Sequence, residues 1–156
     1  TVWDDPTEDY RNGKEYLLPC LRSHKPLDLV VIMLGTNDLK ARFSAPACDV
    51  AAGAGVLVDM VAKSETGPRE GAPKVLLVAP PPFARLSEFA EEFEGGLEKS
   101  RLFSHHFRLV AEERGCPLLD AGEVVVSSEL DGIHLDRDEQ RKLGMAIAGR
   151  IRELLK

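Results

Sequence analysis

The sequence has 156 residues, of which 44% are hydrophobic and 29% are charged, so the chain is long enough to bury a core of its own. Its formal net charge of −6 argues against a nucleic-acid partner, and its apolar runs are too short to cross a bilayer, which argues against a membrane partner. The three cysteines, Cys20, Cys48 and Cys116, fit no metal-ligand spacing. An odd number of unpaired thiols is typical of a cytoplasmic protein.

The first half of the chain predicts one strand between two helices. A polar loop over Thr1–Asn12 leads into a short helix over Gly13–His24, and a strand follows over Leu27–Leu34. This strand includes an unbroken run of six apolar residues, which is typical of a strand buried on both faces in a parallel sheet. A helix over Cys48–Lys63 comes next, with apolar residues at helical spacing.

The second half continues the alternation of strands and helices. It predicts a strand over Lys74–Ala79, a helix over Leu97–Arg114, a strand over Pro117–Leu119 and a last helix that starts at Asp136. Glu139 has the spacing of a capping-box partner of Asp136. The charged connection Phe83–Gly96 is either a cover over a pocket or a surface helix with an apolar side. The alternation predicts an α/β fold with a parallel sheet and helices on both faces.

The predicted strand over Leu27–Leu34 ends in Gly35-Thr36-Asn37-Asp38. Open α/β sheets bind ligands beyond the carboxyl ends of their strands, where this turn lies. The Asn37 amide would donate a hydrogen bond to a developing oxyanion, an interaction worth roughly 3–4 kcal/mol in a transition state. The alternative is a turn that uses Gly and Asn for their backbone tolerance, with Asp38 as the N-cap of a following turn.

A second polar turn, Asp131-Gly132-Ile133-His134, precedes the last predicted helix. A carboxylate that accepts the Nδ1 proton of an imidazole fixes its tautomer and leaves Nε2 free to act as a general base. The alternative is a polar loop without a catalytic role. A metal on Asp131 and His134 is less well supported, because two ligands are too few. The other histidines, His24, His105 and His106, have no carboxylate at a matching spacing.

The two turns together resemble the SGNH (GDSL-type) hydrolase family. Further segments in the same order are most similar to its arylesterase and acyltransferase branch: DDP, LPCL, PLDLVVIMLGTND, APKVLLVAPPP, FEGG and DAG. The resemblance covers essentially the whole chain. It implies one domain over residues 1–156 with the family's flavodoxin-like fold, a three-layer α/β/α sandwich around a five-stranded parallel sheet.

The resemblance also implies roles for individual residues. Asn37, together with Gly35, would form part of the oxyanion hole, and Asp131 and His134 would be the acid and base of a catalytic triad. The family's first block, GDS, supplies the nucleophilic serine, and its second block supplies a glycine, but neither block is present in this chain. We therefore expect residues 1–156 to be the C-terminal portion of the domain, without its first strands and with the nucleophile upstream of Thr1.

The complete protein is expected to be a serine esterase or acyltransferase that acts on small carboxylic esters and needs no metal or organic cofactor. Residues 1–156 alone would be inactive, because they lack the nucleophile. The alternative is a non-catalytic α/β binding module or an inactive fragment. The branch includes homo-oligomers, and an exposed apolar sheet edge would favour association. The acyl and alcohol specificity is not fixed by the sequence.

Overall fold

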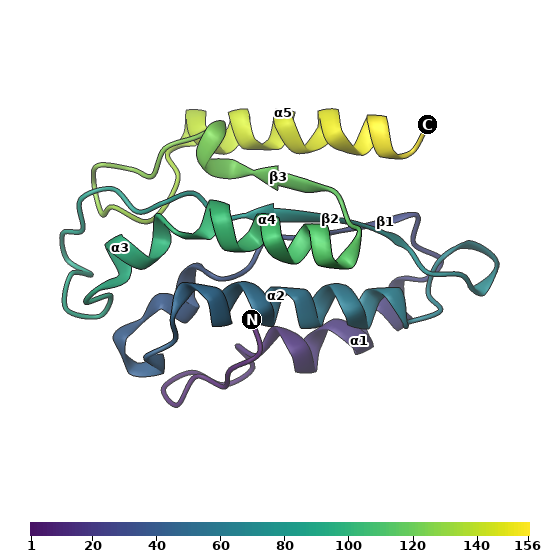
Figure 1. The fold of residues 1–156 in the computed structure, drawn as a ribbon, viewed down its shortest axis with the longest axis horizontal. Coiled ribbons are helices and arrows are strands. Elements are labelled where there is room, and N and C mark those ends of the chain that lie inside the picture. The colour runs from purple at the N-terminus through teal and green to yellow at the C-terminus, as the bar shows by residue number, and fades with distance from the viewer.

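The fold, described for all residues 1–156 by a computed structural model, contains one parallel sheet of three strands (Figure 1). The strands β1 (Leu29–Ile32), β2 (Lys74–Ala79) and β3 (Leu118–Asp120) lie side by side in the order β1-β2-β3. Leu29 is opposite Lys74, and Leu77 is opposite Leu118. The predicted parallel α/β fold is therefore confirmed.

Helices cover both faces of the sheet and give the chain its three layers (Figure 1). The helices are α1 (Gly13–His24), α2 (Ala47–Ala62), α3 (Gly96–Ser100), α4 (Phe103–Arg114) and α5 (Arg137–Leu154). The last helix, α5, lies on one side of the sheet, and α1, α2 and α4 lie on the other. The helices thus sandwich the sheet, as the alternation of elements predicts.

The alternating side chains of β2 face two separate hydrophobic clusters. Val75, Leu77 and Ala79 join the larger cluster, which contains residues of α1, α2 and α4. Leu76 and Val78 join the smaller one, to which α5 contributes Leu143. All five side chains are buried, because both faces of this central strand are covered. Because β2 is packed on both faces, it holds the loops at the carboxyl end of the sheet in defined positions.

The strand β1 differs from the prediction in length and in burial. It is four residues long and pairs with β2 alone, so it forms an edge of this sheet. Only Ile32 is buried, whereas Val31 is 36% exposed and Leu34, just past the strand, is 42% exposed. The expectation of a strand buried on both faces is wrong for this chain, because β1 pairs with β2 alone and lies at the edge of the sheet.

The predicted helix over Leu97–Arg114 is divided into α3 and α4. The buried Ser100 hydroxyl accepts the Phe83 N–H at 2.9 Å and donates to the Leu97 carbonyl at 2.8 Å. Such hydrogen bonds between a side chain and the backbone compete with helix formation. They explain why α3 ends at Ser100 and α4 begins at Phe103.

The predicted capping box of α5 does not form. Asp136 is the N-cap residue, but its carboxylate accepts the Ser128 hydroxyl at 2.8 Å instead of an N–H of the first turn. Glu139 accepts the Val126 N–H at 3.1 Å and pairs with Lys142. Both carboxylates therefore fasten the preceding loop to α5.

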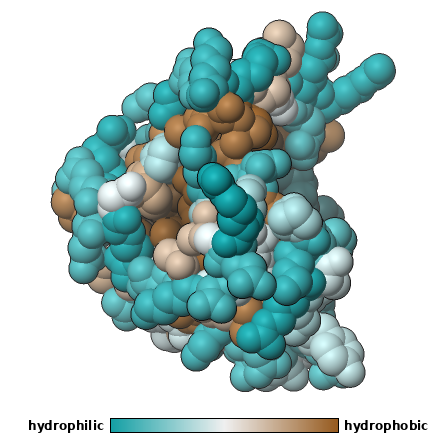
Figure 2. Space-filling view, turned by 90° about the vertical axis from the view of Figure 1, so that its right-hand side faces the viewer, coloured by the Kyte–Doolittle hydropathy of each residue, from teal (hydrophilic) through white to brown (hydrophobic).

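The surface is mostly hydrophilic. In the face drawn in Figure 2, hydrophilic residues form most of the outer surface and hydrophobic residues gather towards the middle. None of the helices combines the length and the apolar character needed to cross a membrane. All three cysteines are free thiols, Cys20 and Cys116 half-buried and Cys48 exposed.

Candidate active site

Asp131 and His134 lie together in the loop between β3 and α5. Asp131 Oδ2 is 2.7 Å from His134 Nδ1, while Asp131 Oδ1 accepts the backbone N–H groups of Ile133 at 2.8 Å and His134 at 2.9 Å. The Ile133 N–H is the main reason why the pKa of Asp131 is lowered. The carboxylate therefore stays ionised at neutral pH and orients the imidazole, whose side chain is 72% exposed.

Gly132 is required by the backbone of this turn. Its φ is +85°, and a Cβ at this position would lie 2.5 Å from the Arg85 carbonyl oxygen. The Gly132 carbonyl accepts the Ala84 N–H at 2.9 Å, and its N–H donates to the Ser128 carbonyl at 2.9 Å. These contacts leave no room for a side chain and fix the turn that brings Asp131 to His134.

Gly132→Ala is expected to destabilise the protein by roughly 2–4 kcal/mol, because it adds a strained φ and a steric clash with the backbone. The measurement is urea unfolding followed by circular dichroism. Gly144→Ala is the matched control, because Gly144 lies within α5 and has open space around its Cα. The control should gain about 0.5–1 kcal/mol from its higher helix propensity. Equal effects in the two variants would contradict the assignment of strain to Gly132.

Two residues separate the Gly35–Asp38 turn from the end of β1. Gly35 is buried with φ +138°, and its Cβ would lie 3.1 Å from Val50 and 3.3 Å from Phe107. Asn37 lies in a short 3₁₀ helix over Thr36–Leu39, is exposed, and has no side-chain hydrogen bond to the protein. Its amide is therefore available to a ligand.

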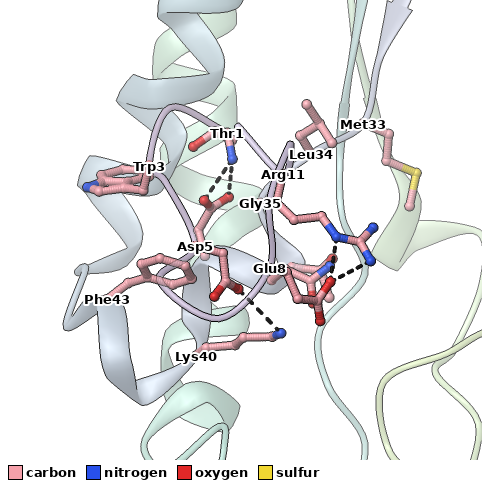
Figure 3. Close-up of a pocket in the computed structure, with 13 residues that line it drawn as sticks. Thr1, Trp3, Asp5, Glu8, Arg11, Met33, Leu34, Gly35, Lys40 and Phe43 are labelled. Atoms are coloured by element: carbon pink, nitrogen blue, oxygen red, sulfur yellow. Dashed lines mark hydrogen bonds and ion pairs between the residues drawn. The ribbon is translucent and has the colours of Figure 1, made fainter. Parts of the chain in front are cut away.

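Asp38 does not act as the predicted N-cap. It is buried inside the 3₁₀ helix, whose N-cap is Gly35, and both of its carboxylate oxygens lie 2.7 Å from the backbone nitrogen of Thr1 (Figure 3). That prediction is wrong because Asp38 lies within the 3₁₀ helix and not at the position before it. Asp38 joins the N-terminal loop to the turn that carries Asn37.

The connection Phe83–Gly96 contacts both turns. Its Ala84 N–H donates to the carbonyl of Gly132, and the Ala41 N–H, shortly after Asn37, donates to the Glu92 carbonyl at 2.8 Å. Most of the connection forms irregular turns rather than a helix, with Phe83 and Phe93 buried. The alternative of a surface helix is therefore wrong. The connection lies across the carboxyl end of the sheet, where both turns are found (Figure 1).

A cavity of about 440 Å³ lies beside Asn37 (Figure 3). Its walls come from the N-terminal loop and from the segment after β1: Thr1, Trp3, Asp5, Glu8, Arg11, Met33, Leu34, Gly35, Thr36, Asn37, Asp38, Lys40 and Phe43. Asp131 and His134 are not among the lining residues. Of the four predicted site residues, Gly35 and Asn37 therefore line this cavity, whereas Asp131 and His134 do not.

Several residues of this cavity could not be predicted from the sequence. Asp5 and Glu8 belong to a polar loop, and Lys40 follows the Gly35–Asp38 turn, but none of them forms a local pattern with a known chemistry. The only available signal was the DDP segment, Asp4-Asp5-Pro6, which contributed to the family resemblance. Long-range contacts, rather than spacing, bring these charges together.

No serine hydroxyl of the chain is hydrogen-bonded to the His134 imidazole; the Ser128 backbone N–H donates to the His134 carbonyl at 2.7 Å. The hydroxyls of three serines in and around this loop donate to other acceptors: Ser87 to the Leu130 carbonyl, Ser127 to the Pro82 carbonyl and Ser128 to Asp136. His24 contacts its neighbours Ser23 and Cys20 at the exposed end of α1, and no carboxylate orients it. No group of three or more His, Cys, Asp and Glu side chains could hold a metal ion.

The structure therefore combines a parallel α/β sheet with an imidazole that a carboxylate orients in the loop before the last helix. A family model described as the GDSL-like lipase/acylhydrolase family matches residues 7–144. The chain belongs to this family of SGNH-type ester hydrolases.

Solved structures agree with this assignment. An aryl esterase of M. smegmatis is 44% identical, with a TM-score of 0.93, and the match covers 98% of this chain and 73% of that one. The carbohydrate acetylesterase Est24 of Sinorhizobium meliloti is 41% identical, with a TM-score of 0.94 and the same coverage. A carbohydrate acetylesterase family member of Sinorhizobium meliloti is 35% identical with a TM-score of 0.92, over 99% of this chain and 74% of that one. No curated protein sequence matches the chain.

Proposed function

We propose that the complete protein is a serine esterase that hydrolyses small carboxylic esters or transfers their acyl group to another alcohol. The observation that carries the proposal is the 2.7 Å contact between Asp131 and His134, which leaves Nε2 of an exposed imidazole free. Family membership and the similarity to an aryl esterase and to carbohydrate acetylesterases support the same chemistry.

In this mechanism His134 Nε2 removes the proton of a serine hydroxyl as its oxygen attacks the ester carbonyl. The Asn37 side-chain amide, with the backbone at Gly35, donates hydrogen bonds to the oxyanion. The imidazolium then returns its proton to the leaving alcohol, and an acyl-enzyme remains. Water or a second alcohol attacks this ester by the same steps and releases the acid or a new ester. Asp131 stays ionised throughout and stabilises the imidazolium.

The nucleophile in this proposal is a serine outside residues 1–156. The serines near the Asp131–His134 turn are committed to other acceptors, as described above. The relatives named above are longer than this chain, which spans 73% of the aryl esterase. Residues 1–156 then form the C-terminal part of one SGNH-type domain, and the chain by itself is inactive.

The cavity beside Asn37 supports small and partly polar substrates. Its volume of about 440 Å³ is sufficient for a small ester. Asp5, Glu8, Arg11 and Lys40 provide charged walls, whereas Trp3 and Phe43 provide apolar ones. An ester with a short acyl chain, such as p-nitrophenyl acetate, is therefore a suitable first assay substrate.

The proposal is tested by the intact mass of the full gene product after incubation with a fluorophosphonate, which labels an activated serine. One adduct per molecule is expected, and the isolated 17.1 kDa chain of residues 1–156 should remain unlabelled. Prior treatment with an excess of p-nitrophenyl acetate should slow the labelling. A full gene product that gains no adduct would overturn the esterase proposal and favour a non-catalytic binding module.

A further inference from the structure

Four charged side chains form an ionic cluster next to the cavity that Asn37 lines. Lys40 Nζ lies 3.1 Å from Glu92 Oε1 and 3.8 Å from Asp5 Oδ2. Arg42 Nη2 lies 2.5 Å from Glu92 Oε1, and its Nη1 lies 3.1 Å from Asp5 Oδ1 and also donates to the Thr7 hydroxyl. Two cations and two carboxylates balance each other, so the ionic cluster carries no net charge.

The ionic cluster is shielded from water more than a surface ion pair. The exposed fraction of its side chains is 6% for Asp5, 12% for Lys40, 28% for Arg42 and 31% for Glu92. Hydrogen bonds from the Thr7 hydroxyl and N–H are the largest causes that lower the pKa of Asp5. Because networks of partly buried, ionised groups hold their geometry better than isolated exposed pairs, this one can fix the segments that carry it.

Three segments distant in sequence meet in the ionic cluster. Asp5 belongs to the N-terminal loop, Lys40 and Arg42 directly follow the Gly35–Asp38 turn, and Glu92 belongs to the connection Phe83–Gly96. A backbone hydrogen bond from the Ala41 N–H to the Glu92 carbonyl reinforces the side-chain contacts. Glu92 therefore binds the segment that follows the turn with Asn37 in two ways: its backbone carbonyl accepts the Ala41 N–H, and its carboxylate pairs with Lys40 and Arg42.

The other end of the same connection holds the Asp131–His134 turn. The Ser87 hydroxyl donates to the Leu130 carbonyl at 2.8 Å, and the Ala84 N–H donates to the Gly132 carbonyl. The Phe89 ring meets His134 edge to face, with 6.1 Å between the ring centroids. Only two residues separate Phe89 from Glu92, so a shift of Glu92 would move the ring that contacts His134.

We propose that Arg42 and Glu92 are positioning residues for ester hydrolysis. Through the connection Phe83–Gly96, they hold the turn that carries Asn37 in a fixed position relative to the turn that carries His134. This inference rests on the proposed function. Neither residue lines the cavity, so neither is expected to contact the substrate. Their effect is on the relative placement of the general base and the oxyanion donor.

Arg42→Met keeps the length of the aliphatic side chain and removes the charge, and Glu92→Gln removes the charge with almost no change of shape. Each is expected to lower kcat of the full gene product by about 10- to 100-fold, because a shift of about 1 Å in a catalytic group costs about 100-fold. KM should change by less than about threefold, since an interaction that orients the transition state affects kcat and kcat/KM alike. The double variant should lose much less than the product of the two single losses, because both changes break the Arg42–Glu92 contact.

Arg150→Met is the matched control. It removes the exposed ion pair between Arg150 and Glu153 on α5, which is distant from both turns, and should leave kcat unchanged. All kinetics are measured well below the unfolding temperature of each variant, so that lost stability alone does not lower kcat. Wild-type kcat in a folded Glu92→Gln or Arg42→Met variant would overturn the inference. The proposed function is tested separately, because it fails only if the full gene product binds no fluorophosphonate or works without His134.

Discussion

His134→Ala is expected to lower kcat for p-nitrophenyl acetate by about 10⁴- to 10⁶-fold in the full gene product, as the removal of a general base does in other serine hydrolases. In the proposed mechanism the imidazole accepts the serine proton and donates it to the leaving alcohol, so the variant loses the proton transfer in both halves of the reaction. KM should change little, because proton transfer by His134 stabilises the transition state rather than the bound ester. The fluorophosphonate labelling rate should fall in parallel with kcat.

The control for this variant is His105→Ala. His105 is an exposed histidine of α4 that contacts His106 and no carboxylate. Its replacement should leave both kcat and labelling unchanged. His134→Ala should also keep the unfolding temperature close to that of the wild type, because the ring is largely exposed. More than about a tenth of wild-type activity in His134→Ala would be incompatible with a general base at this position.

Local patterns predicted the central elements well. The helix Gly13–His24 and the strand Lys74–Ala79 have the predicted boundaries. The spacing of Asp131 and His134, with a glycine between them, predicted a turn that brings the two side chains together, and the 2.7 Å contact confirms this geometry. These features depend on residues that are close in sequence, so the sequence contains the information needed to predict them.

The failed predictions concern contacts between residues that are distant in sequence. Ser100 interrupts a helix because it accepts the Phe83 N–H, which lies 17 residues earlier. The ionic cluster joins Asp5 to Arg42 and Arg42 to Glu92. Neither the hydrophobic periodicity nor the spacing of residues in the sequence predicts such pairs, because the fold determines which distant side chains come into contact. The two turns of the candidate site were therefore predicted, but the cavity beside Asn37 and the ionic cluster next to it were not.

Asn37→Ala is expected to lower kcat by about 10²- to 10³-fold, the usual cost of removing one oxyanion donor. The exposed Asn37 amide has no partner in the protein, so its removal breaks no internal hydrogen bond and should not lower stability. Steady-state hydrolysis of p-nitrophenyl acetate gives kcat and KM. KM should stay nearly constant, because the amide binds the charged intermediate more strongly than the neutral ester.

Asn12→Ala separates this catalytic loss from a structural one. Asn12 caps α1 by accepting the Lys14 N–H at 3.0 Å, and it donates to Asp4 at 2.9 Å. Its replacement should cost about 1 kcal/mol of stability and leave kcat unchanged. Asn37→Ala should show the opposite pattern, with stability retained and kcat reduced. If kcat were unaffected in Asn37→Ala, the oxyanion would have to be stabilised by backbone N–H groups alone, and the exposed amide would serve only the 3₁₀ turn in which it lies.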